Sequence, residues 1–350
     1  MSYTNGLDKP SEHFETKIWT GNGSSQNITG LNFKPDFVWI KDRDDTSSHA
    51  ITDAVRGNTK YLMSNDNYQE ETITDRVTSF NSDGYSLGSS AGVNQNGAGN
   101  VGWNWKAGTS FTNDASGTGI GSMDSAGSVN EEAGFAIVSY TGNETASTLK
   151  HGLSTVPQMI IVKGRIAARD WIVGHHTQGW TTSAMLNETT AYSNQTHWNN
   201  TAPTSSVFTI EGGSNSNVNT NNAAYIAYVF SERQGYSKFG SYVGNGSTDG
   251  TFVYTGFKPA FFMIKRTDSA GSWYIYDNKR DSDNVMTKNL FPDGNFVEDD
   301  NSNNNADFLS NGFKIRTTSG ARNASGGSYI YMAFAENPFT TSTGVPATAR

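Results

Sequence analysis

The sequence predicts an all-β fold built from three tandem β-sandwich units of about seven strands each. Short apolar or alternating runs are separated by Gly, Ser, Thr and Asn, with turn signals about every 8 to 12 residues, which is typical of a β-sandwich. Three kinds of segment also recur three times in the same order, which indicates internal repetition. The composition agrees, because 12% of the residues are aromatic and 37 are glycine, whereas only 17% are charged.

Each unit is expected to begin and to end with a strand of recognisable sequence. An alternating strand that runs into a turn occurs at residues 14–23, 135–144 and 237–246. An aromatic strand closes each unit at residues 101–107, 226–232 and 330–336. Weaker matches between these anchors account for the remaining strands of each unit.

Between the two anchors lies a proline followed by an apolar run and a lysine, as in KPDFVWIK. The three copies occupy residues 34–41, 156–163 and 258–265. Their apolar residues do not alternate with polar ones, so both faces of this strand should be covered. Proline stands just before the strand, where its missing N–H costs least. The pattern predicts a central core strand in each unit, with equivalent positions for Pro35, Pro157 and Pro259.

The lysine that ends this run recurs as Lys41, Lys163 and Lys265. Recurrence suggests a ligand contact, but a charge at the end of an apolar strand also guards against aggregation. We expect the second, simpler role.

The predicted organisation is an N-terminal arm, three units, a linker and a C-terminal tail. The boundaries are 1–13 for the arm, 14–107, 134–234 and 235–339 for the units, 108–133 for the linker and 340–350 for the tail. The linker resembles a flexible Gly/Ser segment, and a longer loop with some structure is the competing interpretation. The polar arm has little reason to be ordered alone, so we expect it to dock on another protein and to be dispensable for folding.

Charge and composition exclude several classes of function. The formal net charge is −8 and the basic residues are scattered, so nucleic acid is not a predicted partner. With no cysteine, disulfides, thiolate metal sites and cysteine nucleophiles are excluded. Neither a signal peptide nor a membrane span is expected, and no membrane partner is predicted. A phosphate-binding loop is also missing, so we predict no cofactor.

One short motif raises the question of hydrolase chemistry. Gly88, Ser90 and Gly92 satisfy G-x-S-x-G, which places a nucleophilic serine on a strand-to-helix turn in hydrolases. No helical pattern follows, and the corresponding loops of the other two units lack the motif. A polar hairpin loop is therefore the expected structure, and no catalytic residue is predicted.

Carboxylates and histidines are the remaining candidates for catalysis and metal binding in the sequence. Sandwich-type glycosidases need two carboxylates on one strand face, and no E-x-D-x-x-E pattern is present. His175 and His176 are adjacent, so on a strand they point to opposite faces. Acid clusters at 44–45, 281–283 and 298–300 could hold a hard cation, but they lack the spacing of a calcium loop and are expected to be solvated. No metal site is predicted.

Aromatic side chains in a polar loop of the second unit form the candidate glycan-binding set. They are Trp180, Tyr192, His197 and Trp198. Such rings can stack on sugars, and core packing or anchoring of a long loop is the competing interpretation.

Several longer blocks resemble a family of virion proteins of tailed bacteriophages, many of them from marine hosts. The blocks are NITGLNFKPDFVWIKDRD, DAVRGNTKYLMSN, TSFNSDGYSLGS, GWNWKAG and YSKFGSYVGNG. The resemblance covers nearly the whole chain, from Gly6 onward, and its third unit carries the most specific matches. Proteins of this family are described as tail fibre proteins with concanavalin-like repeats, a jelly-roll type of β-sandwich.

The resemblance implies a location on the virion and supplies no catalytic residue. It implies a non-enzymatic structural protein, either a tail fibre or knob or a capsid decoration, that contributes to host-surface attachment. Other virion proteins and a host-surface glycan are the implied partners, with several copies in each particle. Assembly in a reducing host cytoplasm agrees with the lack of cysteine. The alternative function is a polysaccharide-degrading glycoside hydrolase of the sandwich type.

Overall fold

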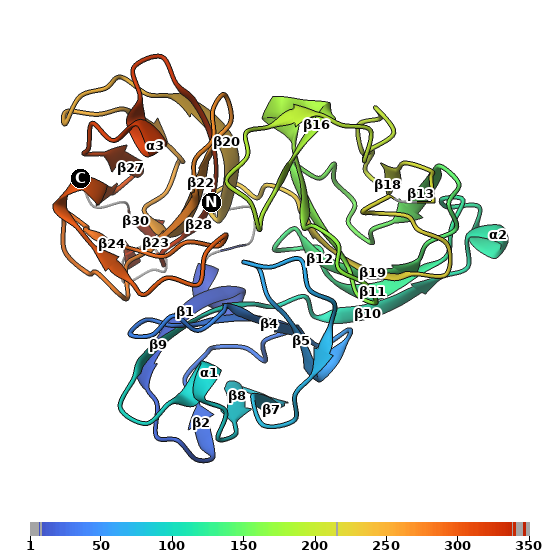
Figure 1. Cartoon of the computed structure of the whole chain (residues 1–350), viewed down its shortest axis with the longest axis horizontal. Helices are drawn as coiled ribbons and strands as arrows, with labels where there is room; N and C mark the ends of the chain where they lie inside the picture. The colour runs from blue at the N-terminus through green and yellow to red at the C-terminus, as the bar shows by residue number, and fades with distance from the viewer. Residues whose placement is uncertain (1–6, 8, 215, 338, 341–345, 348–350) are drawn as a thin grey trace.

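The computed structural model describes residues 7, 9–214, 216–337, 339–340 and 346–347. The named strands pair antiparallel, and three groups of sheets surround a common centre (Figure 1). The prediction of an all-β sandwich fold is confirmed. Among the described residues, no helix is long and apolar enough to span a membrane.

The first unit contains a six-stranded sheet and a three-stranded sheet. The order in the large sheet is β1 (Phe14–Thr20), β9 (Gly99–Trp105), β3 (Phe37–Asp42), β4 (Ala50–Asp53), β5 (Gly57–Leu62) and β6 (Glu71–Thr72). The small sheet consists of β2 (Gln26–Ile28), β8 (Gly84–Leu87) and β7 (Val77–Asn81). Apolar residues of both sheets, such as Val38 and Tyr85, share one buried cluster, which makes the pair a sandwich.

The second unit has the largest sheet. Its order is β10 (Thr109–Asn113), β11 (Ser125–Asn130), β12 (Phe135–Thr141), β19 (Ala224–Phe230), β14 (Met159–Gly164), β15 (Ile172–His175), β16 (Gly179–Met185) and β17 (Ser193–Asn194). A pair of strands, β13 (Ser147–Lys150) and β18 (Val207–Ile210), packs on it around a second cluster.

The third unit repeats the arrangement. Its large sheet is β20 (Ser237–Val243), β28 (Ser328–Ala335), β22 (Pro259–Arg266) and β23 (Trp273–Asp277), and its small sheet is β21 (Phe252–Tyr254), β27 (Gly312–Ile315) and β26 (Ala306–Leu309). Two short pairs complete it, β24 (Lys288–Asn289) with β25 (Asp299–Asp300) and β29 (Phe339–Thr340) with β30 (Pro346–Ala347). Helices are single turns at α1 (Ala91–Asn94), α2 (Ala115–Thr118) and α3 (Gly320–Asn323), with 3-10 turns at Pro10–Glu12, His176–Gln178 and Ser302–Asn304.

The proline-led runs occupy the same place in all three large sheets. Each lies beside the closing strand of its unit, with Phe37 opposite Trp105, Met159 opposite Phe230 and Phe261 opposite Phe334. All six residues of β3 and of β14 are buried, as is the centre of β22. The prolines that precede these pairs are also buried. The prediction of central, fully covered strands is confirmed.

A single aromatic core joins the three units. One face of each large sheet contributes to the same buried cluster. Ring contacts link every pair of units: Phe37 and Tyr228 lie 4.6 Å apart, Phe14 and Phe334 5.0 Å, and Phe230 and Phe239 5.9 Å, between ring centroids. The units therefore surround a shared interior instead of forming a linear array of separate domains (Figure 1).

The prediction of a flexible linker at 108–133 is wrong. This segment forms β10, α2 and β11, and β11 pairs with β12 at the edge of the second large sheet. Phe111 and Val129 pack against the core of the second unit, and the Asp114 side chain accepts the N–H of Gly117 at the start of α2. Glycine and serine dominated the composition, but a few apolar and capping residues decide the structure. The competing interpretation, a loop with structure of its own, was closer.

The expectation for the N-terminal arm also needs correction. Residues 1–6 and 8 lie outside the described part of the chain. Leu7 is 2% exposed and belongs to the shared core, and Pro10 and His13 are buried. The N–H of Ser11 donates to Oδ1 of Asn337 over 2.9 Å, so the arm contacts the third unit of its own chain. Deleting residues 1–13 would remove core side chains, and a folded product is no longer expected. Of the predicted tail at 340–350, only Thr340 and residues 346–347 are described.

Candidate functional site

Three of the four predicted glycan-binding residues are buried, and the fourth, Tyr192, is partly buried. Trp198 is fully buried and Trp180 is 9% exposed, and their rings meet edge to face with centroids 5.3 Å apart. His197 is buried and shares a 2.8 Å hydrogen bond with the Ser183 hydroxyl. Tyr192 packs against the shared core. These side chains do not offer the free ring faces that stacking on sugars requires, so packing and loop anchoring are their roles.

Ser90 does not stand in a hydrolase arrangement. Its carbonyl oxygen accepts the N–H groups of Val93 and Asn94, which form the single turn α1. The turn is a departure from the sequence expectation, which placed no helix there. In the described part of the chain, no histidine or carboxylate hydrogen-bonds the Ser90 hydroxyl. The geometry gives this serine a structural place only.

The adjacent histidines connect the second unit to the third. Nε2 of His175 lies 3.4 Å from the carbonyl oxygen of Tyr331, and Nε2 of His176 lies 2.9 Å from that of Phe239. Burial lowers the pKa of His175 to about 3, so this ring is neutral. Among the described residues, no group of three or more His, Asp or Glu side chains is placed to hold a metal ion.

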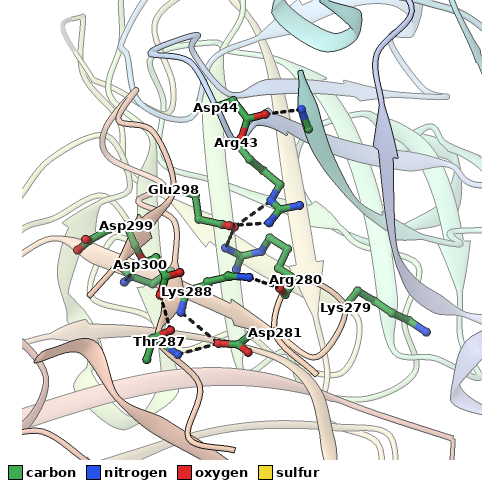
Figure 2. A network of polar contacts seen from close by, with 12 residues as sticks. Arg43, Asp44, Lys279, Arg280, Asp281, Thr287, Lys288, Glu298, Asp299 and Asp300 are labelled. Carbon is green, nitrogen blue, oxygen red and sulfur yellow. Dashed lines mark hydrogen bonds and ion pairs between the residues drawn. The ribbon is translucent and has the colours of Figure 1, made fainter. Parts of the chain in front are cut away.

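The acid clusters of the third unit are used in ion pairs and turns. Figure 2 shows Glu298 between the guanidinium groups of Arg43 and Arg280. Asp281 accepts the N–H of Thr287 over 2.7 Å, and Asp300 accepts the Thr287 hydroxyl over 2.5 Å (Figure 2). These carboxylates are not simply solvated loop residues, because part of the cluster closes the contact between the third unit and the first.

The junction between the third and first units contains a buried chain of charges. Arg43 of the first unit donates to both oxygens of Glu298, at 3.0 and 2.6 Å. Arg280 donates to Glu298 over 2.9 Å and to Asp277 over 2.5 Å. Trp103 of the first unit completes it by donating its indole N–H to Asp277 over 3.0 Å. Burial disfavours the charge on Arg280, but Asp277 and Glu298 outweigh it and raise the pKa.

The junction between the first and second units repeats this chain. Arg165 of the second unit donates to both oxygens of Glu70, each over 2.9 Å. Arg56 donates to Glu70 over 3.1 Å and to Asp53 over 2.5 Å. The hydroxyl of Tyr228, in the second unit, donates to Asp53 over 2.8 Å. Asp53 and Asp277 are equivalent in register, since they pair with Phe37 and Phe261.

The junction between the second and third units keeps the geometry without the charges. His175 takes the aspartate position opposite Met159, and Gln178 stands where the buried arginines stand in the other units. The backbone N–H of Tyr192 donates to the carbonyl oxygen of Thr267 over 3.1 Å. The backbone N–H groups of Glu70 and Glu298 donate in the same way to the carbonyl oxygens of Arg165 and Arg43. Tyr192 thus stands where the junction glutamates stand in the other units, partly buried against the shared core.

The prediction that the recurring lysines guard exposed strand ends is wrong, because all three are buried, and Lys163 and Lys265 contact a neighbouring unit. Lys41, Lys163 and Lys265 are fully buried. Nζ of Lys163 donates to the carbonyl oxygen of Asn67 in the first unit over 3.1 Å, and Nζ of Lys265 to that of Thr189 in the second over 2.9 Å. Lys41 donates to the carbonyls of Asp42 and Asp45. Burial lowers the pKa of Lys41 to about 8, of Lys163 to about 7 and of Lys265 to about 8.

These lysines predict a pH dependence of stability. Each releases its proton at a lower pH in the folded state than in the unfolded chain, where the pKa is 10.5. Between pH 8 and 9.5 the unfolded state therefore binds more protons, and the free energy of unfolding should rise with pH, by about 1.4 kcal/mol per pH unit for each neutral lysine. Urea unfolding across this range measures the slope.

Lys163→Met is the matched variant for this measurement. It removes one titrating group while keeping an unbranched apolar stem, so the slope between pH 8 and 9.5 should fall by roughly a third. A stability that is flat or decreasing with pH in the unsubstituted protein would contradict the assignment.

A groove of about 840 Å³ opens on the second unit. Residues of the β10 and β11 segment line it, and the described strands of the other two units include no counterpart of that segment. Polar side chains line it, among them Asn113, Asp114, Ser122, Asp124 and Arg165. Both carboxylates already serve the local fold, since Asp114 accepts the Gly117 N–H and Asp124 the Ala115 N–H. The groove offers hydrogen bonds to a polar ligand.

The geometry defines an all-β protein whose sandwich units are joined around one aromatic core by buried polar junctions. A model for a domain of unknown function, DUF7483, matches residues 9–338. The chain therefore belongs to the DUF7483 family. No curated protein and no solved structure matches it.

Proposed function

We propose that the chain is a non-enzymatic structural protein of a tailed bacteriophage particle. It is exposed on the virion, as a tail fibre or knob or as a capsid decoration, and contributes to host-surface attachment. Other virion proteins and a host-surface glycan are its partners, and several copies are present in each particle. The sequence resemblance set out above is the source of the virion assignment.

One structural observation supports this proposal most directly. Two buried ion pairs, Asp53 with Arg56 and Asp277 with Arg280, each accept a hydrogen bond from a side chain of a neighbouring unit, Tyr228 and Trp103 respectively. Perturbed titratable groups more often mark an active site when they face a cleft. Here the two pairs face a neighbouring sandwich instead, and contacts that fix the units to one another suit a structural protein of the particle surface.

Two measurements test the proposal. Antibodies raised against the purified protein should label intact phage particles, and a particle that carries no label would overturn the virion assignment. Incubation with host envelope polysaccharide should release no new reducing ends. If reducing ends accumulate and Asp114→Asn or Ser90→Ala abolishes them, the glycoside hydrolase alternative replaces the structural role.

A further inference from the structure

An exposed pair of aromatic rings projects from the small sheet of the third unit. Phe252 and Tyr254 on β21 are 44% and 64% exposed, whereas Val253 between them is buried in the core of that unit. Residues two apart on a strand point to the same face. Both rings therefore stand on the outer face of the sheet, outside the buried core cluster of the unit.

The corresponding strands of the other units show that the fold does not need these rings. Val253 lies opposite Phe313, Ile28 opposite Tyr85 and Leu149 opposite Phe208, which aligns β21 with β2 and β13. In this alignment the places of the two aromatics are taken by polar residues: Asn27 and Thr29 in the first unit, Thr148 and Lys150 in the second. Exposed aromatic rings on this strand are thus particular to the third unit.

The surroundings of the rings are flat and polar. The ring of Phe252 lies across Gly312 on β27, where a Cβ atom would come within 3.0 Å of its Cε2. Lys314 stands opposite Phe252 on the same face and forms an ion pair with Asp249, whose side chain is 85% exposed. We call Phe252, Tyr254, Lys314 and Asp249 the β21 platform.

The size of the platform distinguishes between kinds of partner. The two rings expose together about 200 Å², given ~150–250 Å² for each aromatic side chain, and a stable protein interface needs about 800 Å² on each side. The strand is also only three residues long, so an added strand would gain few backbone hydrogen bonds. A protein partner therefore fits poorly.

A saccharide ring matches what the platform offers. The C–H faces of a pyranose are apolar and flat and pack on aromatic faces, while its hydroxyl groups point outward and accept or donate hydrogen bonds. We propose that the β21 platform binds a sugar ring of a host-surface polysaccharide, with Phe252 and Tyr254 stacking on the ring and Lys314 and Asp249 bonding its hydroxyls. This inference rests on the proposed function and names the surface that performs attachment.

The test compares retention of purified variants in gels cast with envelope polysaccharide from the propagating host. Phe252→Asn combined with Tyr254→Thr installs the residues of the first unit, and we expect the apparent affinity to fall about tenfold or more. Tyr254→Phe keeps the ring and should retain most of the affinity. Tyr68→Ala is the matched control, because this tyrosine is 57% exposed on the first unit. Thermal unfolding should be unchanged in all three.

The outcomes separate this inference from the proposed function. Equal retention of the double variant and the unsubstituted protein would overturn the platform, as would a lack of retention in the unsubstituted protein while virions carry the antibody label. Loss of particle incorporation with normal retention would assign the surface to a protein partner and would also overturn it. Retention that depends on the rings, with unlabelled virions, would support the platform and remove the virion role instead.

Discussion

Replacing Trp103 by alanine is expected to lower the free energy of unfolding by about 3–5 kcal/mol. Trp103 is fully buried on β9, in the core shared by the three units. Its ring lies 5.8 Å from that of Trp39 in its own unit and 6.0 Å from that of Phe261 in the third unit, between centroids. Alanine would leave a cavity at the point where the sheets meet, and the loss includes the hydrogen bond to Asp277.

Denaturant unfolding of the variant and of Trp103→Phe measures this effect. Phenylalanine keeps most of the apolar volume but cannot donate to Asp277, so it should cost less than alanine. Because residues of all three units line this core, we expect one cooperative transition that shifts as a whole. A variant whose stability is unchanged, or in which only part of the protein unfolds earlier, would contradict the shared core.

The fold could be predicted from sequence because its signals are local. The proline-led runs, the opening strands and the closing strands each carry their pattern within about ten residues, and the described strands match those positions. The linker at 108–133 was misjudged because glycine and serine dominate it. Its pairing with β12 depends on a strand that lies further along the chain.

The candidate site was harder to predict because burial depends on contacts between distant units. Trp198 looks like a loop aromatic in sequence, but it is fully buried. Lys163 follows an apolar run, and only the first unit, about a hundred residues earlier in the chain, supplies the carbonyl of Asn67 that it contacts. Sequence alone shows that this lysine recurs in each unit, and only the packed units show which carbonyl oxygens it contacts.

Recurring polar pairs in the sequence also indicate buried contacts. Asp53 and Arg56, like Asp277 and Arg280, are three residues apart at aligned positions, and both pairs are buried. Asparagine after a turn glycine recurs as well. Asn22, Asn143 and Asn245 each donate their N–H to the side chain of a second asparagine, at Asn94, Asn219 and Asn323. Both sets are visible in the sequence when the polar residues of the three repeats are aligned.

The three junctions differ in how much the chain itself holds them together. The first and second units are connected through β10 and β11, and the second and third through the short segment 231–236. The third unit has no such direct connection to the first in the described chain, although the N-terminal arm reaches Asn337. The junction between the third and first units therefore depends most on side-chain contacts. These contacts are made by the chain of charges formed by Asp277, Arg280, Glu298 and Arg43.

Asp277→Ala is expected to destabilise the protein by about 3–5 kcal/mol, because it leaves the guanidinium of Arg280 buried without its nearest carboxylate. Both side chains of this pair are 0% exposed. Trp103 and the N–H groups of Lys279 and Arg280 would lose their acceptor as well. The change in the free energy of unfolding, measured with urea near neutral pH, tests this expectation.

A double replacement separates the charge from the packing. Removing both charges with Asp277→Leu and Arg280→Met should cost less than Asp277→Ala alone, because no buried charge then remains without its partner. Asp53→Ala is the matched control at the junction between the first and second units, where the chain is continuous through β10 and β11. If the double replacement is as damaging as the sum of Asp277→Leu and Arg280→Met made singly, the two side chains act independently, and the idea that they form one coupled unit beside the junction is wrong. If the two single losses together exceed the double loss by more than about 1 kcal/mol, Asp277 and Arg280 act as one unit, which accepts the indole N–H of Trp103 and donates to Glu298 at the junction between the third and first units.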